Sequence, residues 1–541
     1  MSYESIYVSK ILLTRLFLIS CTILSVLCTL PEQTLVTISA TSGRNGSIVP
    51  YGPTSIKVGE NLTYSIIPDP KHRIANVYVD DKSIGAVDSY IFENVSSDHS
   101  IHATFERDVY TICPKIVKGE GTIYPDGYIE IQSGDSISFI ITPDSNYILH
   151  NVIIDDSSVG AVTSVSFPHV TANHSLKVSF LRDVDTIPVT DSNIVYTGRF
   201  DFSDSENVSF AWPGISITAS FEGTYCGMLL RQVPVPEMAI NSKYNANYYN
   251  IFIDDREPKV IKATVKDSIF EIAKNLPPGP HTVTIYKRTE ALCGTGEFLG
   301  FLLDRGTHLL PPPQPPERRI EFIGNSITCG YGNEGKSTDK FKGSIENSYL
   351  SYAAITARNL DAEYHLISYA GIGIHLNSDS STTNTIPEIY NRCCPLDSSI
   401  AWNFISWTPH VVVINLGAND FGTIGGIPDS LAFINSYQNF IRRIHNNYPE
   451  SAIFCLDGPM PGYPVIDTVS GEQITSLDIL RNYLNKIVEN AKSDGISNIY
   501  TFSLTLIDPD IGYGAEGHPN VYQHKLNAAE LTVFIREKMG W

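Results

Sequence analysis

The chain has 541 residues and a formal net charge of −20. A single core seldom grows beyond roughly 250–300 residues, so this length predicts several domains. The acidic balance, without any run of lysine and arginine, argues against a nucleic-acid partner, which would need a basic face against its phosphates. It suits a protein that acts on neutral substrates.

The first thirty residues differ from the rest of the chain. Lys10 and Arg15 precede the apolar run LFLISCTILSVLCTL. A membrane-spanning helix needs about 20 apolar residues, so residues 1–30 are predicted to be a signal peptide. The stretch LISC resembles a bacterial lipobox, which would leave a lipid on Cys21; ordinary cleavage near Cys28 is the alternative. In either case we expect a secreted or cell-surface protein.

An internal repeat follows the signal peptide. Residues 35–108 and 109–183 align at an offset of 75 residues, so that Asp80 matches Asp155. Both copies alternate apolar and polar residues over short runs broken by Gly, Pro and Asp, which predicts small all-β domains. The Asp-Asp pairs are interpreted as hairpin turns, because the ligand spacing of a calcium loop, the alternative, is missing. We expect the repeats to act as spacers or to contact the cell surface or a glycan.

Residues 186–310 form a third β-rich unit. Strand-like runs of roughly 5–8 residues between turn residues predict a β-sandwich of the jelly-roll kind. Cys226 and Cys293 both fall in this unit and could form a disulfide in an oxidising compartment. Three aromatic residues are interpreted as core, with stacking on sugar rings as the alternative: Trp212, Tyr248 and Tyr249.

The pattern changes after the Pro-rich stretch PPPQPPE, residues 311–317, which is predicted to be a stiff linker. Over residues 318–541, apolar runs alternate with helical stretches, which predicts an α/β domain whose parallel sheet is covered on both faces. The predicted strands are 320–323, 364–368, 411–416, 452–456 and 498–503, and the predicted helices are 345–358, 429–447, 474–493 and 521–538. Sites in such folds lie beyond the carboxyl ends of the strands.

Residues that can perform acyl transfer follow these strands. Ser326 comes after the first strand, Gly371 after the second, Asn419 after the third and His518 after the fifth. A serine hydroxyl needs a base to accept its proton, and His518 is the candidate base. The backbone N–H groups of Ser326 and Gly371 and the Asn419 amide are candidate donors to an oxyanion. This set predicts serine-based acyl transfer that needs no metal or cofactor.

The segments around these residues resemble the blocks of the SGNH (GDSL-like) hydrolases: RRIEFIGNSITCGYGNEG, EYHLISYAGIGI, WTPHVVVINLGANDF and GHPNVYQHKLNAAEL. Together with NYYNIFIDD and YKRTEALCGTGEFLGF, they make residues 190–541 similar to carbohydrate esterase family 2. The resemblance implies a jelly roll fused to a flavodoxin-like SGNH hydrolase domain. It also implies removal of acetyl groups from plant-wall polysaccharides such as xylan and glucomannan, or from their oligosaccharides.

The chain departs from the family pattern at two places. Asn325 stands where the family usually has Asp before the serine; because an amide oxygen can make the same turn hydrogen bonds, we expect Ser326 to stay competent. Glu516 and Gly517 stand where Asp-Trp commonly precedes the histidine. Glu516 is therefore the candidate orienting acid for His518, and the alternative is a Ser-His dyad whose imidazole is held by a backbone carbonyl.

Other interpretations stay open at this point. Cys329 is a candidate thiol nucleophile, although a buried structural cysteine is the commoner case. His518 and His524 are a candidate metal pair, although their spacing points them differently. At the level of function, the alternatives are a glycan-binding protein whose esterase domain has decayed, and an acetyl transferase or an esterase for another acyl substrate.

Overall fold

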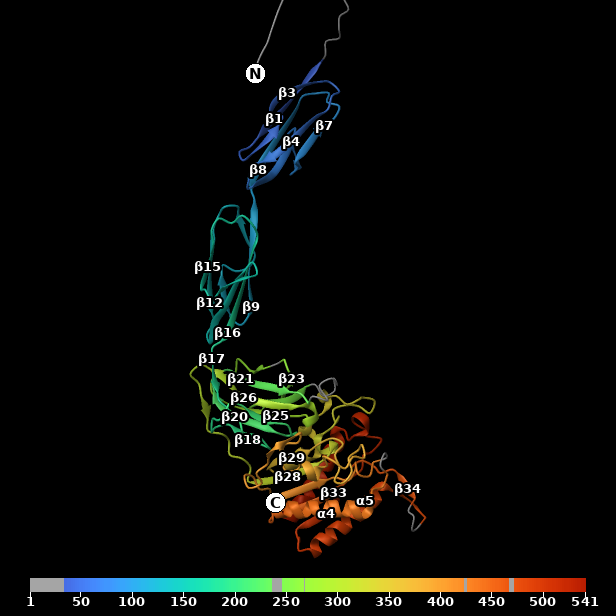
Figure 1. The fold of residues 1–541 in the computed structure, drawn as a ribbon. Helices are drawn as coiled ribbons and strands as arrows, with labels where there is room; N and C mark the ends of the chain where they lie inside the picture. The colour runs from blue at the N-terminus through green and yellow to red at the C-terminus, as the bar shows by residue number, and fades with distance from the viewer. Residues whose placement is uncertain (1–33, 236–245, 267, 423–425, 467–470) are drawn as a thin grey trace, which may run out of the picture. The chain divides into compact units, whose positions relative to one another are not determined.

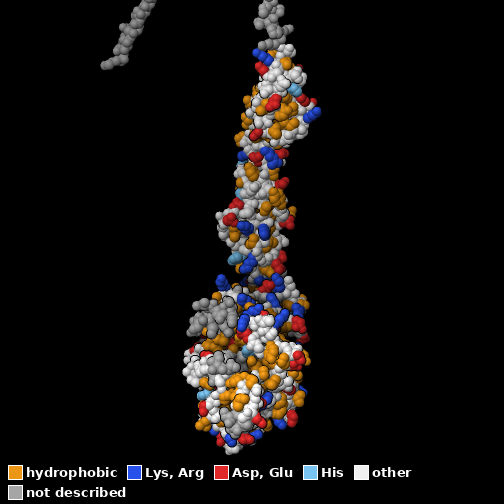
Figure 2. Space-filling view, turned by 90° about the vertical axis from the view of Figure 1, so that its right-hand side faces the viewer, with side chains coloured by type: hydrophobic (Ala, Val, Ile, Leu, Met, Phe, Trp, Pro, Cys, Tyr) orange, Lys and Arg blue, Asp and Glu red, His pale blue; other side chains and the backbone are white. Residues whose placement is uncertain are grey.

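The computed structural model describes residues 34–235, 246–266, 268–422, 426–466 and 471–541 (Figure 1). The chain divides into two compact units, Met1–Leu181 and Arg182–Trp541. The predicted signal peptide, with Cys21 and Cys28, lies outside the described residues. In the part of the chain that is described, no helix combines the length and the apolar character that crossing a membrane requires. On the face drawn in Figure 2, acidic and basic side chains are interspersed.

The two repeats of the first unit share one strand topology. The first repeat has sheets β3-β1-β8-β5-β6 and β2-β4-β7, and the second has β11-β9-β16-β13-β14 and β10-β12-β15 in the corresponding positions. Each repeat closes its own apolar core between its two sheets. The strands are β1 (Leu35–Ser42), β2 (Gly46–Val49), β3 (Gly52–Lys57), β4 (Leu62–Pro68), β5 (His72–Val79), β6 (Lys82–Gly85), β7 (Ser89–Phe92), β8 (His99–Arg107), β9 (Val109–Lys118), β10 (Gly121–Tyr124), β11 (Ile129–Gln132), β12 (Ile137–Pro143), β13 (Tyr147–Ile154), β14 (Ser157–Gly160), β15 (Ser164–Phe167) and β16 (His174–Arg182).

The Asp-Asp pairs form hairpin turns. Asp80 and Asp81 connect β5 to β6 with φ values of 48° and 62°. Positive φ at both central residues is what a type I′ turn requires, and Asp tolerates it better than most residues. The Asp80 carboxylate accepts the Ser100 N–H at 2.8 Å and lies 2.7 Å from His99 Nδ1. Asp155 makes the equivalent contacts in the second repeat, so both carboxylates are occupied by protein partners.

The second unit begins with a β-sandwich. One sheet has the order β17-β26-β21-β24, with β19 beside β26, and the facing sheet has the order β18-β20-β25-β22-β23, with β27 beside β20. Trp212 and Tyr249 are completely buried in the apolar core, as the core interpretation requires, whereas Tyr248 is only partly buried. The strands are β17 (Val184–Ile187), β18 (Val195–Thr197), β19 (Val208–Phe210), β20 (Ser216–Glu222), β21 (Cys226–Val233), β22 (Asn247–Ile253), β23 (Lys259–Ala263), β24 (Ile269–Ala273), β25 (Pro280–Lys287), β26 (Thr295–Asp304) and β27 (Leu309–Leu310).

The suggested disulfide between Cys226 and Cys293 is wrong. Cys226 begins β21, Cys293 ends the 3-10 turn η1 (Ala291–Cys293), and both are free, buried thiols. Burial raises the pKa of each thiol, so each stays protonated and packs as a small apolar side chain. Membership of one β-rich unit does not bring two cysteines within bonding distance, which the sequence pattern could not test.

The α/β domain is built on parallel strands in the order β29-β28-β32-β33-β36. The first strand along the chain, β28, lies between the second and the third, which is the flavodoxin-like order. The predicted fold class is confirmed. The strands are β28 (Arg318–Gly324), β29 (Ala362–Ser368), β32 (Val411–Asn415), β33 (Ala452–Asp457) and β36 (Ile499–Ser503); short pairs are formed by β30 (Arg392–Cys394) with β31 (Asp397–Ala401) and by β34 (Pro464–Ile466) with β35 (Gln473–Thr475).

Helices cover both faces of this sheet. Alternation along β28 sends Ile320 and Phe322 to the face under α2 and α6, and Ile323 to the face under α4 and α5. The core on the Ile323 face runs on into the β-sandwich, so the two domains of this unit share one apolar interior. The helices are α1 (Ser326–Cys329), α2 (Tyr352–Asn359), α3 (Ile386–Ile389), α4 (Ser430–Asn447), α5 (Ser476–Ser493) and α6 (Val521–Met539).

The predicted helix over 345–358 is shorter than expected. Only α2 is regular there, preceded by the single 3-10 turns η2 (Gly343–Ile345) and η3 (Ser348–Leu350). Asn347 explains the break: its side chain accepts the Tyr349 N–H at 3.2 Å, and its own N–H donates to Asn333 Oδ1 at 3.1 Å. Tertiary partners thus take the backbone groups that a longer helix would have used.

A buried ion pair joins the sandwich to the α/β domain. Arg199 Nη2 lies 2.9 Å from Glu321 Oε1, and both side chains are 0% exposed. The Tyr390 hydroxyl donates to the other Glu321 oxygen at 2.5 Å. The guanidinium lies 4.8 Å from the Tyr390 ring centroid and 5.3 Å from that of Trp402. Both charges are therefore paired away from water.

Replacing Arg199 by Met should destabilise the second unit. The substitution leaves the Glu321 carboxylate buried and unpaired, which typically costs about 3–5 kcal/mol. Calorimetry should show a lower unfolding temperature, and the double variant Arg199→Met/Glu321→Leu should recover most of the loss because no buried charge remains. An Arg199→Met protein as stable as the wild type would contradict this role for the pair.

Candidate active site

Ser326 begins the short helix α1 just after β28, the strand that lies between β29 and β32. Asn325 caps this helix: its side-chain oxygen accepts the Ile327 N–H at 3.0 Å. The amide therefore makes the local hydrogen bond expected of it. The Ser326 side chain sits in a largely buried position, 7% exposed, at the carboxyl edge of the sheet.

His518 contacts Ser326 although it lies 192 residues further along the chain. Its Nε2 lies 2.9 Å from Ser326 Oγ, within hydrogen-bonding distance. The residues before it make a sharp turn, the 3-10 turn η4 (Ala515–Gly517), in which Glu516 and Gly517 have φ values of 52° and 80°. This left-handed backbone directs the imidazole toward the serine.

Burial lowers the pKa of His518 below its ordinary value of about 6.5, because desolvation disfavours the imidazolium. The nearby backbone of Ala515 and Glu516 and the Glu516 charge oppose this shift only in part. The ring is therefore neutral near pH 7, and Nε2 can accept the Ser326 proton when Nδ1 carries the ring hydrogen. Among the described residues, no acceptor meets hydrogen-bond geometry with Nδ1.

The structure does not bring Glu516 into the orienting position suggested for it. Its carboxylate accepts the Tyr331 hydroxyl at 2.8 Å and lies 3.7 Å from Lys340 Nζ. The Tyr331 ring packs against His518, with centroids 4.5 Å apart. The left-handed backbone at Glu516 accounts for this direction of its side chain, and both the backbone and the charge of Glu516 act to raise the pKa of His518.

Asn419 lies on the same cavity as Ser326 and His518, a space of about 320 Å³. Its Nδ2 donates to the Ile372 carbonyl at 2.7 Å. Because an amide nitrogen carries two hydrogens, this bond fixes the side chain and leaves one hydrogen for a ligand. Gly371, the residue before Ile372, lines a neighbouring cavity of about 490 Å³. The loop that carries Gly371 is thus attached to Asn419 by one hydrogen bond.

Asp420, to which the sequence analysis assigned no role, holds the same loop. Its buried carboxylate accepts three backbone N–H groups, from Ile374 at 3.0 Å, His375 at 2.7 Å and Leu376 at 2.8 Å. Burial raises the pKa of Asp420 although these bonds favour the ionised form. Its position directly after Asn419 at a strand end was the available sequence signal.

Cys329 and His524 are buried and bonded in ways that fit a structural role. Cys329 is completely buried, 3.3 Å from Ser368 Oγ, and burial raises the pKa of its thiol. His524 Nδ1 accepts the Tyr352 N–H at 3.1 Å, and burial lowers the pKa of His524 to about 3. No group of three metal-binding side chains is found in the described part of the chain.

Comparisons with known proteins agree with this arrangement. The model of the Carbohydrate esterase 2 N-terminal domain matches residues 196–313, and that of the GDSL-like Lipase/Acylhydrolase family matches residues 322–526. A family two carbohydrate esterase from Clostridium thermocellum, solved in complex with cellohexaose, is 37% identical with a TM-score of 0.58; the match covers 64% of this chain and 99% of that one. The chain belongs to carbohydrate esterase family 2.

Curated relatives extend the comparison for this family 2 esterase. Cellulase/esterase CelE of Acetivibrio thermocellus is 37% identical over 361 residues, 66% of this chain, and the match spans 41% of the length of CelE. An acetylxylan esterase / glucomannan deacetylase of Cellvibrio japonicus is 26% identical over 67% of this chain and 94% of its own length. The resemblance inferred from the sequence is confirmed.

The lowered pKa of His518 predicts where activity falls at acid pH. Protonation removes the base, and since the pKa lies below about 6.5, the neutral ring persists to a lower pH than that of an exposed histidine. The pH dependence of kcat/KM for an aryl acetate reports this group in the free enzyme. We expect its acidic limb to be centred below 6.5, and a midpoint above 6.5 would contradict the assignment.

A Glu516→Gln variant tests whether this carboxylate orients His518. An orienting carboxylate in direct contact with the histidine is worth about 10⁴ in kcat. Because the Glu516 carboxylate bonds to the Tyr331 hydroxyl and His518 Nε2 faces Ser326, we expect kcat to fall by less than roughly tenfold. Tyr331→Phe, which removes the hydroxyl that Glu516 accepts, is the matched control. A thousandfold loss in Glu516→Gln alone would show a direct contact in the working enzyme.

Proposed function

We propose that this chain hydrolyses O-acetyl esters of plant cell-wall polysaccharides, such as xylan and glucomannan, or of their oligosaccharides. The observation that carries the proposal is the 2.9 Å contact between Ser326 Oγ and His518 Nε2 on a cavity that Asn419 also lines. The substrate class is supported by the Cellvibrio japonicus relative, whose name states both activities.

In the first half of the reaction, Ser326 Oγ attacks the acetyl carbonyl carbon while His518 Nε2 accepts the hydroxyl proton. The carbonyl oxygen becomes an oxyanion, and its proposed donors are the N–H groups of Ser326 and Gly371 and the second hydrogen of Asn419 Nδ2. The tetrahedral intermediate collapses as His518 returns the proton to the sugar oxygen. The products of this half are the free sugar hydroxyl and an acetyl-Ser326 ester.

In the second half, water replaces the sugar. Neutral His518 takes a proton from the water as its oxygen attacks the acetyl carbon, and the same donors hold the new oxyanion. Collapse breaks the bond to Ser326 Oγ, which recovers its proton from His518, and acetic acid leaves and ionises to acetate in solution. The neutral state of His518 at pH 7, which burial favours, is the state that both halves require.

A polymeric substrate fits an exported enzyme. We extend the proposal to export through residues 1–30, on the sequence pattern alone: basic residues followed by an apolar run too short to span a membrane. The N-terminal repeats would then act as a spacer or as a contact to the cell surface or a glycan. Cell fractionation with a Cys21→Ser variant distinguishes lipid anchoring from free secretion.

Acetate release from acetylated xylan, acetylated glucomannan and an aryl acetate tests the proposal. Ser326→Ala should lower kcat by at least about 10³, because the nucleophile is removed while binding remains. Ser220→Ala, a serine exchanged on strand β20 of the sandwich, should leave the rate unchanged. Full activity of the Ser326→Ala protein would refute serine chemistry.

Other outcomes would favour the alternative functions. Retention of the wild-type protein on a polysaccharide affinity gel without any ester cleavage would indicate a binding protein whose esterase domain has decayed. Cellohexaose belongs in that experiment, since a solved relative holds it. Appearance of an acetylated sugar when a free sugar is added would indicate transfer in place of hydrolysis.

A further inference from the structure

The β-sandwich reaches the Gly371 loop through Glu290. This residue follows β25, its side chain is 0% exposed, and its Oε2 accepts the Ala370 N–H at 2.7 Å. Three hydrogen bonds hold the turn that presents it: Lys287 Nζ donates to the Thr289 and Glu290 carbonyls, and the Glu290 N–H donates to Glu346 Oε2 at 3.0 Å. A side chain of one domain therefore holds the backbone of the other.

The hydrogen bond from the Ala370 N–H to Glu290 lies directly before the Gly371 N–H in this loop. Among the described residues, each backbone N–H from Tyr369 to Leu376 has a protein acceptor except that of Gly371. From the first donor to the last along the loop, the acceptors are Gly324 O, Glu290 Oε2, Tyr369 O, Asn377 Oδ1 and the Asp420 carboxylate. With its neighbours held, the Gly371 N–H keeps a defined direction and stays available to a ligand.

Glu290 lies in surroundings that disfavour an ionised carboxylate. Glu290 and Glu346 are both 0% exposed, and the Oε1 atom of each has no partner among the described residues. Burying carboxyl groups with unfilled hydrogen-bonding capacity is unfavourable, and burial correspondingly raises the pKa of both. Buried ionisable groups in such unfavourable surroundings are concentrated at functional sites.

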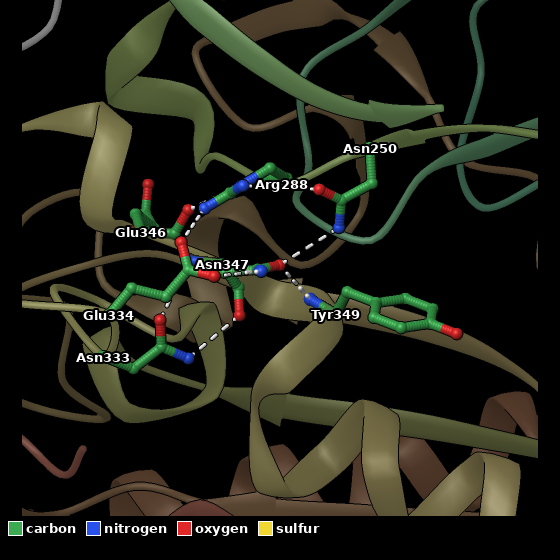
Figure 3. A network of polar contacts seen from close by, with 7 residues as sticks. All are labelled: Asn250, Arg288, Asn333, Glu334, Glu346, Asn347 and Tyr349. Atoms are coloured by element: carbon green, nitrogen blue, oxygen red, sulfur yellow. Dashed lines mark hydrogen bonds and ion pairs between the residues drawn. The ribbon is translucent and has the colours of Figure 1, made fainter. Parts of the chain in front are cut away.

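The adjacent Arg288 makes a second link across the same interface (Figure 3). It forms an ion pair with Glu334 and donates to the Glu346 carbonyl at 3.2 Å. Asn347 Nδ2 also donates to Glu334, at 2.9 Å, and the Asn347 N–H donates to Asn333. The network thereby holds the loop that follows the nucleophile.

That loop in turn supports the histidine. The Asn333 carbonyl accepts the Val521 N–H at 3.1 Å, and the Gly332 carbonyl accepts the Ala515 N–H at 2.9 Å. Val521 and Ala515 each lie three residues from His518. Arg288 and Glu290, two residues apart on one turn of the sandwich, thus contact the supports of both the histidine and the Gly371 loop.

We propose that Glu290 is a positioning residue for ester hydrolysis: by accepting the Ala370 N–H, it directs the Gly371 N–H toward the oxyanion. This rests on the proposed function, since it deepens the role given there to Gly371. The sandwich is accordingly part of the catalytic apparatus. Glu290 acts only in the transition state through Gly371, so its loss should appear in kcat and leave KM nearly unchanged.

Two substitutions of Glu290 separate this role from packing. Glu290→Met keeps the volume and removes the acceptor, while Glu290→Gln keeps an oxygen that can accept the Ala370 N–H. With an aryl acetate, we expect kcat of Glu290→Met to fall about 10–100-fold, the range of a partly misplaced oxyanion donor, with KM within roughly threefold. Glu290→Gln should retain kcat within about fivefold of the wild type.

Glu363→Ala is the matched control. Glu363 lies on β29, the strand before the loop; its carboxylate accepts Trp407 Nε1–H at 2.9 Å at the other end of that strand. Its kcat should match the wild type even if its unfolding temperature falls. An unchanged kcat in folded Glu290→Met, or an equal loss in Glu290→Gln and Glu290→Met, would overturn the inference. Absence of Ser326-dependent hydrolysis in the wild type would instead refute the proposed function.

Hydrogen exchange gives a readout that needs no activity. In the wild type, the Ala370 amide should exchange slowly and the Gly371 amide fast, because only the first has an acceptor. Glu290→Met should speed exchange at Ala370 while Glu363→Ala leaves it unchanged. Should Glu290→Met not fold, the wild-type pattern decides: an unprotected Ala370 amide, or a protected Gly371 amide, would overturn the inference.

Discussion

The site depends on β28 being hydrogen-bonded in parallel register to β29 on one side and β32 on the other. Gly324, the last residue of β28, pairs with Ser368 of β29 and with Asn415 of β32. Three strands therefore end at the same level, and the segments that leave them begin within contact distance of one another. Because these strand ends are aligned, Ser326, the Gly371 loop and Asn419 lie near one another in space although they are far apart along the chain.

The contacts between sandwich and hydrolase domain combine a shared apolar core with buried charges. An apolar interface by itself tolerates sliding, since dispersion contacts are individually weak and non-directional. The ion pair between Arg199 and Glu321 opposes such sliding, because any displacement that separates the two side chains leaves two unpaired charges in the protein interior. The directional contact between Glu290 and Ala370 is held within this fixed frame.

The sequence predicted the features that periodicity and strand ends encode. The parallel sheet, helices α4, α5 and α6, and the approach of Ser326 to His518 follow from alternating apolar runs and from residues placed directly after them. The strand-end rule also placed Asn419 on the cavity.

Features that depend on tertiary geometry could not be predicted from the sequence. The direction of the Glu516 side chain depends on a positive φ at that residue, which glutamate rarely adopts. The short α2 results from hydrogen bonds of Asn347 to distant partners. Glu290 lies 80 residues from Ala370 and in another domain, and its segment YKRTEA carries no pattern that names a partner.

The apolar core that runs from the sandwich into the hydrolase domain has a consequence for how such enzymes can be recombined. A hydrolase fragment that begins at the Pro-rich stretch 311–317 would expose a hydrophobic face to water. It would also lack Arg199, the partner of Glu321. Gene shuffling that transplants the hydrolase alone should therefore yield insoluble protein. The stretch from Arg182 to Trp541 forms one compact unit despite its two architectures, and we expect that it has to be transferred whole.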